Sequence, residues 1–330
     1  MEPDVVEDGQ VHIEKRYITD LITEHAIDFL DEFEREEQPF YLGVHYTAPH
    51  SPWERSEHPE TYLFMYDDCP FESVPELPEH PNQNRTCPRG TGERRKELLS
   101  GYYAAITAMD AGIGQIIAKL EEMGVRDNTL IIFMSDNGMN MGHHGIWGKG
   151  NGTFPLNMFD TSVKVPAIFA HPGVIPEGRT NEELVSQYDI FPTILDYVGI
   201  ENPEADGLPG HSFLPLLRGE KQTGRDNVVI FDEYGPVRMI RNKDWKYVHR
   251  YPYGPHELYD LKNDPDETMN RTDDPICRNI LDSLRVELGD WFRQYVLPDK
   301  NGAIEPVTGF GQLAKTGAEK PVGGSFKDIT

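Results

Sequence analysis

Apolar residues in the first part of the chain recur with two different periods. Over residues 18–34 they return every three to four positions, which predicts an amphipathic helix of about four turns. Pro39 ends this pattern, and the apolar run at residues 40–46 predicts a short buried strand. Two prolines within residues 47–53 would interrupt strand pairing, so this stretch is predicted to be a loop. The chain therefore opens with a helix, a strand and a loop.

The same order repeats further along the chain. Residues 53–95 are rich in Pro, Glu and Asn with little periodicity, which is typical of a long surface segment and often of a binding loop. Residues 103–120 show a helical pattern closed by Gly124, and the β-branched run at residues 129–134 predicts a buried strand of the parallel type. Alternating helices and strands favour an open α/β sheet with crossover connections.

Two further elements precede a change of pattern. Residues 165–169 predict another strand, and residues 189–198 predict a helix with Pro192 in its first turn. A domain boundary is expected near residues 219–224. The two predicted domains are an α/β domain at residues 1–224 and a smaller α+β subdomain with a tail at residues 225–330.

The C-terminal part predicts a small antiparallel sheet covered by one helix. Short strand patterns occur at residues 227–231, 237–241, 245–250 and 257–261. The polar turn at residues 241–244 indicates a hairpin, and residues 276–296 show a helical pattern. The last roughly 30 residues are rich in Gly, Lys and Thr and are expected to form an irregular tail.

Charge and composition exclude several classes of partner. The formal net charge is −25, from 31 basic and 56 acidic residues, so neither nucleic acid nor a membrane is expected as a partner. An anionic ligand would need local positive charge. A soluble protein is expected, because no apolar run approaches the roughly 20 residues of a membrane span and the acidic residues 1–10 lack the apolar core of a signal peptide. The three cysteines favour neither a zinc site nor a disulfide framework.

Two adjacent oxygen-bearing side chains follow the predicted strand at residues 129–134. Asp136 offers a charged oxygen and Asn137 a neutral one, which are ligand types that Ca²⁺ and Mg²⁺ take. Gly138 would allow a sharp turn that aims both side chains at one point. A plain Asp-Asn-Gly turn is the competing interpretation, since such turns are common after strands.

A glycine-rich stretch carries a positive charge. Lys149 lies between Gly148 and Gly150, so a ligand could approach the backbone and the ammonium together. A solvated lysine in a flexible loop is the alternative interpretation. The neighbours His143 and His144 would point in opposite directions on an extended chain, so at most one of them is expected to face a site.

One histidine lies in a loop bounded by prolines. His50 follows the predicted strand at residues 40–46, and it could donate a hydrogen bond to an anion or move a proton. The alternative is an ordinary loop histidine that packs on Trp53. Because ligands of open α/β sheets bind at the carboxyl ends of strands, His50, Asp136 and Asn137 are expected at the same rim.

Six short signatures, taken together, are similar to one family. They are Pro49-His50-Ser51-Pro52, Ser135-Asp136-Asn137-Gly138, His144-Gly145-Ile146-Trp147-Gly148-Lys149-Gly150, Val163-Lys164-Val165-Pro166, Asp189-Ile190-Phe191-Pro192-Thr193-Ile194-Leu195 and Glu257-Leu258-Tyr259-Asp260-Leu261-Lys262-Asn263-Asp264-Pro265. In this order and spacing they resemble the sulfatase family, within the alkaline-phosphatase-like superfamily, over the stretch from Tyr17 to Asp266. Each signature alone is weak, whereas the set is specific.

The resemblance implies a fold, a reaction and residue roles. The fold would be α/β, a mostly parallel sheet sandwiched by helices, with a small C-terminal antiparallel subdomain. The reaction would be hydrolysis of a sulfate ester of a small molecule or glycan. Asp136 and Asn137 match the pair that binds Ca²⁺, with Mg²⁺ or Mn²⁺ as alternatives. Lys149 and His50 match residues that contact the sulfate and assist the leaving oxygen, and His144, in the same signature as Lys149, is expected to bind substrate. Metal and ammonium would neutralise the anion and the charge on the departing alcohol.

One part of the family pattern is absent. Family members begin with a strand that ends in two metal-binding aspartates, followed by Cys-x-Pro-Ser-Arg or Ser-x-Pro-x-Arg, whose first residue becomes the formylglycine nucleophile. The segments Cys87-Pro88-Arg89 and Asp67-Asp68-Cys69-Pro70 have the wrong spacing or place, and both are interpreted as coincidental. The sequence thus corresponds to the C-terminal two-thirds of a sulfatase, and little or no turnover is expected from it alone.

Several alternatives stay open at this point. The sequence could begin late in a longer protein, belong to a split enzyme completed by an upstream polypeptide or an oligomer partner, or be degenerate. Hydrolysis of phosphonate or phosphate esters is an alternative reaction, because phosphate and sulfate are nearly isosteric. Anion or glycan binding without catalysis is an alternative of another class. The substrate itself is not predicted, although residues 53–95 and 151–159 are expected to shape its pocket.

Overall fold

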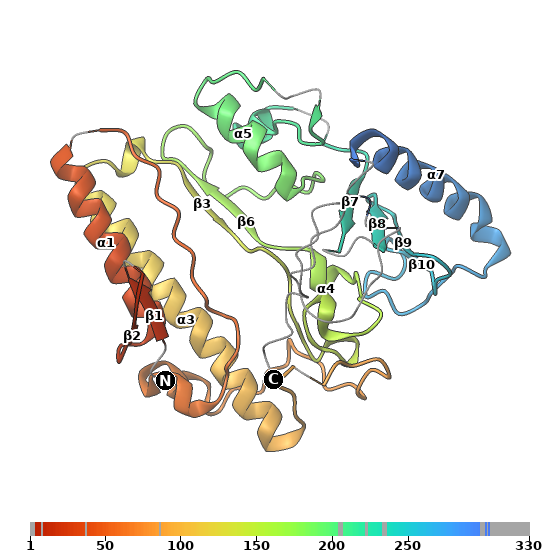
Figure 1. Cartoon of the computed structure of the whole chain (residues 1–330), viewed down its shortest axis with the longest axis horizontal. Coiled ribbons are helices and arrows are strands. Elements are labelled where there is room, and N and C mark those ends of the chain that lie inside the picture. Colours follow the sequence, from red (N-terminus) through yellow and green to blue (C-terminus); the bar gives the residue numbers. More distant parts are fainter. Residues whose placement is uncertain are drawn as a thin grey trace. The chain divides into compact units, whose positions relative to one another are not determined.

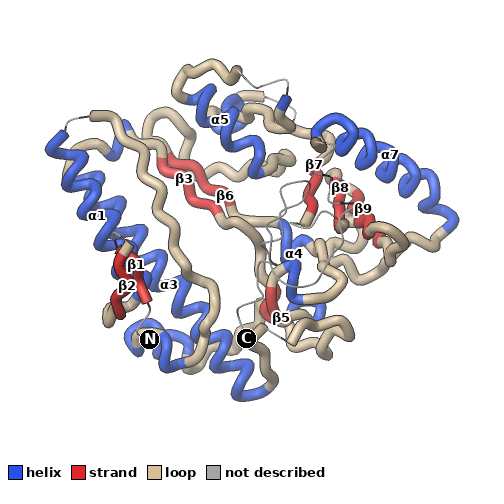
Figure 2. Tube along the Cα trace, in the orientation of Figure 1, coloured by secondary structure: helices blue, strands red, loops and turns tan. Residues whose placement is uncertain are grey.

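The fold comes from a computed structural model, which describes residues 4–7, 9–36, 38–85, 87–203, 207–221, 224–232, 236–297, 301 and 303 (Figures 1 and 2). The chain forms two compact units. Among the described residues, unit 1 consists of residues up to 134, residues 139–153 and residues 167–173. Unit 2 consists of residues 135–138, residues 154–166 and the residues from 174 onward. The predicted domain division at residue 224 stays a prediction.

Two long helices form the frame of unit 1. Helices α1 (Ile18–Glu36) and α3 (Gly92–Glu122) lie side by side (Figure 1), while α2 (Glu60–Leu63) is a single turn. The stripe that α1 buries includes Leu21, Ala26 and Leu30, so the predicted helix is confirmed. The second predicted helix is confirmed too, but it begins well before residue 103. Its first turns are rich in Glu, Arg and Lys, which favour a helix without forming an apolar stripe.

The strands of unit 1 form short antiparallel pairs. They are β1 (Asp4–Glu7) with β2 (Gln10–Ile13), β3 (Ile131–Met134) with β6 (Ala167–Ala170), and β4 (Asn140–Met141) with β5 (Trp147–Gly148). The strands predicted at residues 129–134 and 165–169 are confirmed as β3 and β6. The pairing and burial predicted for β3 are wrong, since its partner is antiparallel and β3 is only half-buried. An apolar β-branched run does not determine the direction of its neighbour.

The buried strand predicted at residues 40–46 is wrong. None of the described residues forms a ladder with this segment, and its side chains alternate between half-buried and exposed, with Tyr41 at 84% exposure. One side of the segment lies against α1: Phe40 stacks on Phe33, and the Tyr46 hydroxyl donates to Thr23 Oγ1 at 2.8 Å. An apolar face is enough to hold an extended segment on a helix, whereas a strand also needs a hydrogen-bonding neighbour.

Unit 2 is built on the four-stranded antiparallel sheet that the C-terminal pattern predicts. The strands β7 (Val228–Phe231), β8 (Val237–Arg241), β9 (Trp245–Arg250) and β10 (Glu257–Asp260) follow the order β10-β9-β8-β7. Helix α7 (Arg278–Tyr295) packs against the sheet through a core of Val229, Ile240, Tyr247, Leu258, Leu281, Leu284, Leu288 and Phe292. The shorter helices of this unit are α4 (Asp160–Val163), α5 (Ile190–Tyr197) and α6 (Leu214–Leu217). The predicted antiparallel sheet with one covering helix is confirmed.

Ionised side chains are buried where β9 meets α4. Lys246 is fully buried, and its Nζ lies 2.5 Å from Asp160 Oδ1 and 2.6 Å from Glu267 Oε1. Arg241 Nη2 binds the other oxygen of Asp160 at 3.1 Å. Burial opposes ionisation of Asp160, but Lys246 and Arg241 hold the pKa of that carboxyl below its usual range. Two acids and two bases thus neutralise one another, as buried charges require.

The predicted C-terminal tail and the predicted absence of a membrane span can be compared with the structure only in part. The tail expected over the last 30 residues lies almost wholly outside the described residues. Within the part of the chain that the structure describes, no helix is both long enough and apolar enough to cross a membrane.

Candidate active site

The His50 loop is anchored on α3. The indole Nε1 of Trp53, which is 1% exposed, donates to Pro49 O at 2.9 Å, and the His50 N–H donates to Thr47 O at 2.9 Å. A Cβ on Gly101 of α3 would lie 2.0 Å from Trp53 O, so glycine is required where the loop touches the helix. The exposed His50 ring holds Ser51 O with Nδ1 at 2.9 Å. Since a carbonyl only accepts, Nδ1 carries the proton in this hydrogen bond.

The Lys149 loop is a tight hairpin with an irregular tip. Strands β4 and β5 pair through Asn140 and Gly148, and the buried Asn140 side chain also donates to Gly148 O at 3.1 Å. His144 has φ 56° and ψ 15°, a left-handed conformation that a residue other than glycine adopts at some cost in energy. His144 and Lys149 are both half-buried. The pairing fixes the backbone before the lysine, and the Gly152 N–H, which donates to Lys149 O at 2.9 Å, holds the backbone after it.

A separate segment, residues 80–84, is hydrogen-bonded to this hairpin, a contact that the sequence analysis did not predict. The side-chain amide of Gln83 binds Trp147, the His80 N–H donates to Gly145 O at 2.9 Å, and the Asn84 N–H donates to Gly152 O at 2.7 Å. Part of the long stretch at residues 53–95 thus lies along the Lys149 loop. Its predicted role as a binding loop stays a prediction, whereas its role as a support is observed.

One hydrophobic cluster joins the two loops of unit 1. Trp53, three residues after His50, and Trp147, two residues before Lys149, share it with Leu98 and Leu99 of α3. Phe71, Val74 and Met141 complete its buried members. The loops of His50 and Lys149 are thus built on the same core, although a hundred residues separate them in the sequence.

The Asp136 loop belongs to unit 2 and has little backbone freedom. Gln187 Nε2 donates to Ser135 O at 2.6 Å and to Asp136 O at 3.2 Å. Ser135 Oγ donates to Asn137 O at 2.8 Å, and the Asn137 N–H donates to Asp136 Oδ1 at 2.9 Å. The Asp136 side chain is exposed. Among the described residues, no hydrogen bond reaches its Oδ2 or the side-chain amide of Asn137.

Gly138 serves a different purpose from the one predicted. It is not among the described glycines with positive φ, so it makes no special turn. Its N–H donates to Ser162 O at 2.9 Å, and a Cβ would lie 2.2 Å from Thr161 O of α4. Glycine is therefore needed for close approach to α4, which fixes the end of the loop.

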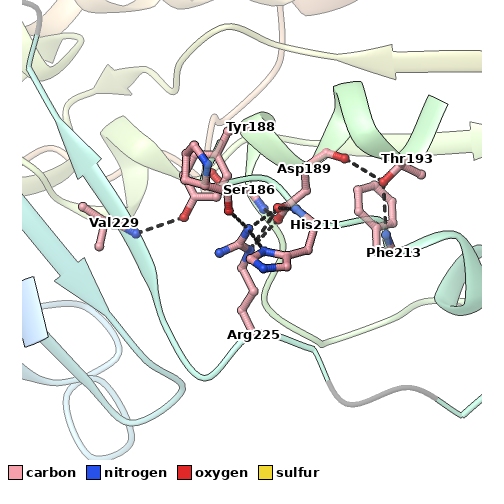
Figure 3. A network of polar contacts seen from close by, with 9 residues as sticks. Ser186, Tyr188, Asp189, Thr193, His211, Phe213, Arg225 and Val229 are labelled. Carbon is pink, nitrogen blue, oxygen red and sulfur yellow. Dashed lines mark hydrogen bonds and ion pairs between the residues drawn. The ribbon is translucent and has the colours of Figure 1, made fainter. Parts of the chain in front are cut away.

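A buried carboxylate holds the turn that carries Gln187 (Figure 3). Asp189, 2% exposed, accepts from the Ser186 N–H at 2.8 Å and the His211 N–H at 2.9 Å, and it binds the guanidinium of Arg225. That guanidinium also lies 4.6 Å from the centre of the Tyr188 ring. The helix predicted from residue 189 is confirmed as α5, but sequence reasoning missed the carboxylate network, because its partner Arg225 lies 36 positions further along.

With these loops in place, comparison with known proteins decides the family. The family model described as sulfatase matches residues 3–200 of this chain. The chain belongs to the sulfatase family. A second model, described as N-sulphoglucosamine sulphohydrolase, C-terminal, matches residues 142–294, which contain the Lys149 loop and the sheet of unit 2.

Individual sulfatases and their structural neighbours agree with this assignment. The choline-sulfatase of Rhizobium meliloti is 30% identical over 256 residues, which are 72% of this chain and 47% of that protein. A structure solved in complex with its substrate D-glucosamine-2-N,6-O-disulfate shares the fold at TM-score 0.75 and 24% identity, covering 92% of this chain and 75% of that one. The phosphonate monoester hydrolase of Agrobacterium radiobacter has TM-score 0.69 and 26% identity, covering 84% of this chain and 62% of that one. The alkaline-phosphatase-like α/β fold is confirmed.

The match is partial in length. The chain spans about half the length of the curated relatives it matches, 47% for the choline-sulfatase and 57% for the arylsulfatase of Clostridium perfringens. The activity of a whole sulfatase is therefore only proposed for this chain.

Asp136 and Asn137 fit part of a calcium shell. They offer one charged and one neutral oxygen from a loop with a fixed backbone, which suits a hard cation. Within the described ranges, no group of three or more His, Cys, Asp or Glu side chains comes together as a metal site. Calcium takes about six to eight oxygens, so these two residues would be a minority of its ligands. Metal binding at this loop stays a prediction.

The residues present do not fit formylglycine, the sulfatase nucleophile. Cys87 does lie beside the Lys149 loop, since a Cβ on Gly148 would come within 2.5 Å of Cys87 Sγ. Burial raises the pKa of the Cys87 thiol more than Arg89 and Lys149 lower it, so the thiol stays protonated at neutral pH. The segment also lacks the family's spacing of Cys, Pro and Arg.

Proposed function

We propose that this chain takes part in the hydrolysis of sulfate esters and supplies the side chains that bind the sulfate and assist the leaving group. Membership of the sulfatase family supports the reaction class. The observation that carries the proposal is the common core of the His50 and Lys149 loops, because Trp53 and Trp147 share one cluster. In a chain of net charge −25, Lys149 would provide the local positive charge that an anionic ester needs.

Each side chain has a role suited to its chemistry. The ammonium of Lys149 would bind the sulfate and stabilise negative charge on the departing oxygen. His50 holds its Nδ1 proton on Ser51 O, so Nε2 would accept a hydrogen bond when the ring is neutral and donate one to the leaving oxygen when it is charged. His144 would add a contact to the substrate. Asp136 and Asn137 would hold Ca²⁺, which would supply further positive charge for an anionic ester.

The substrate within this proposal is a sulfate ester of a sugar or a small molecule. The match to the C-terminal region of N-sulphoglucosamine sulphohydrolase supports a sugar, and the relationship to choline-sulfatase supports a small alkyl ester. Both classes present the same anionic group to the same side chains. Because a phosphonate monoester hydrolase is among the structural neighbours, a phosphonate monoester is the comparison substrate.

The test measures binding and cleavage separately. The purified chain is titrated with an aryl sulfate, choline sulfate, glucosamine 6-sulfate and an aryl monoester of a phosphonic acid, and the released sulfate or phosphonic acid is quantified. We expect binding of sulfate esters with little or no release of sulfate, and binding about tenfold or more weaker in Lys149→Met. Lys243→Met, which removes an exposed lysine paired with Glu183, is the matched control. Binding or cleavage of the phosphonate with no response to any sulfate ester would show the proposal wrong.

A further inference from the structure

We infer that Gln187 is a positioning residue for the Asp136–Asn137 loop, holding both side chains ready for a cation. The inference rests on the cation-binding role in the proposed function. Gln187 is exposed and lies in the turn before α5, about fifty positions along the chain from the loop. Neither its type nor its place in the sequence marks it as part of a metal site.

The geometry of its amide is specific. One nitrogen, Nε2, donates to two consecutive carbonyls, Ser135 O at 2.6 Å and Asp136 O at 3.2 Å. A primary amide has two N–H groups on that nitrogen, so each carbonyl can receive its own proton. The two carbonyls are thereby turned toward Gln187, and this sets the backbone orientation from which the Asp136 and Asn137 side chains project.

Three other backbone atoms of the loop are hydrogen-bonded without Gln187, two of them within the loop and one to α4. Ser135 Oγ donates to Asn137 O, the Asn137 N–H donates to Asp136 Oδ1, and the Gly138 N–H donates to Ser162 O. Among the described residues, Gln187 is the only hydrogen-bond donor to Ser135 O and Asp136 O. Removing its amide would therefore release the first half of the loop and leave the second half attached to α4.

The turn that carries Gln187 is itself held in place by hydrogen bonds. It directly follows Ser186, whose N–H is bound by the buried Asp189 carboxylate, and Asp189 is bound in turn by Arg225 (Figure 3). The positioning amide thus projects from a turn whose backbone is tied to a buried ion pair. Groups that orient metal ligands from behind commonly change metal affinity about 10-fold to 100-fold when removed.

The test uses Ca²⁺ itself as the probe. CaCl₂ is titrated by calorimetry into the unaltered chain, Gln187→Met and the control Gln294→Met, which replaces an exposed glutamine of α7. Gln187→Met keeps the length of the side chain and removes the donor. We expect about tenfold weaker Ca²⁺ binding in Gln187→Met alone, together with faster hydrogen exchange of residues 135–138 and an unchanged unfolding temperature without Ca²⁺. If Gln187→Met does not fold, Gln187→Asn is used, whose shorter amide should give an intermediate loss.

The outcomes separate this inference from the proposed function. Equal Ca²⁺ affinity in the unaltered chain and in the Gln187 variant overturns the inference, and so does an unaltered chain that binds no Ca²⁺ at millimolar concentration. Weaker Ca²⁺ binding in the Gln187 variant, from a chain that responds to no sulfate ester, would overturn the proposed function and sustain the inference.

Discussion

Gln83 and Trp147 meet through a complete pair of hydrogen bonds: Gln83 Nε2 donates to Trp147 O at 2.9 Å, and the Trp147 N–H donates to Gln83 Oε1 at 2.8 Å. A carboxamide carries the same donor and acceptor as a peptide group, so this side chain acts as one residue of a neighbouring strand. Lys149 follows two residues later. The backbone that presents the ammonium is thus tied to residue 83.

The first prediction follows from this pair. Gln83→Leu leaves the N–H and C=O of Trp147 without their partner, so we expect the free energy of unfolding to fall by about 1–3 kcal/mol. We also expect weaker binding of an aryl sulfate, because the Lys149 loop loses its support. Urea unfolding and calorimetry measure the two effects. Gln38→Leu, at an exposed position of unit 1, should change neither.

The second prediction concerns the glycine before the lysine. Gly148 has φ 120°, and a Cβ there would lie 2.5 Å from Cys87 Sγ. Gly148→Ala should destabilise the protein by about 1–3 kcal/mol from backbone strain alone, with the clash added. The double variant with Cys87→Ala should recover only the part of the lost unfolding free energy that the clash causes. Gly114→Ala, in an open position of α3, should be neutral or slightly stabilising, and a similar loss there would contradict the argument.

A third prediction tests the buried charges of unit 2. Glu267→Leu removes one acid from Lys246, which is fully buried, and leaves an excess positive charge. Breaking a buried pair in this way costs about 3–5 kcal/mol of unfolding free energy. Arg278→Ala breaks an exposed pair with Asp282 and should cost less than about 1 kcal/mol. Comparable losses in the two variants, measured by urea unfolding, would count against a buried network.

The fourth prediction is a pH dependence in unit 2. His249 of β9 is buried, its ring stacks on His256 with centroids 4.2 Å apart, and it lies near the positive charges of Arg285 and Arg238. Burial, then His256 and the two arginines, lower the pKa of His249 from its ordinary 6.5 to about 4. The folded state thus favours the neutral ring. The contribution of the neutral His249 ring to the free energy of unfolding is fully present above pH 6.5 and is lost as the pH falls through about 4.

Between neutral pH and pH 4 we expect the free energy of unfolding to fall by about 3 kcal/mol, measured by urea unfolding of the whole chain at a series of pH values. His249→Phe should lack this part of the dependence. His12→Phe, which replaces an exposed histidine of β2, should keep it. Identical pH profiles in all three proteins would rule out His249 as the source.

Local periodicity predicted the parts of the fold that depend on neighbours in sequence. It gave α1, α5, α7 and the antiparallel sheet of unit 2, where each strand pairs with the next in the chain. It failed for the partner of β3 and for residues 40–46, because a strand's neighbour is a tertiary property.

The same distinction holds at the candidate site. Residue type made His50, Asp136 and Lys149 candidates, and the resemblance to the sulfatase family gave them predicted roles. Gln83 and Gln187 could not be predicted, because their roles depend on contacts 64 and 52 positions away, and glutamine has no chemistry that marks it.

In the loop at residues 135–138, the carbonyls of Ser135, Asp136 and Asn137 and the N–H groups of Asn137 and Gly138 are already hydrogen-bonded. Such a loop has little conformational entropy left to lose when a ligand arrives. A cation captured there would meet a template that is rigid before binding. The entropy change of capture would then be set chiefly by water leaving the ion, and hardly at all by ordering of the chain.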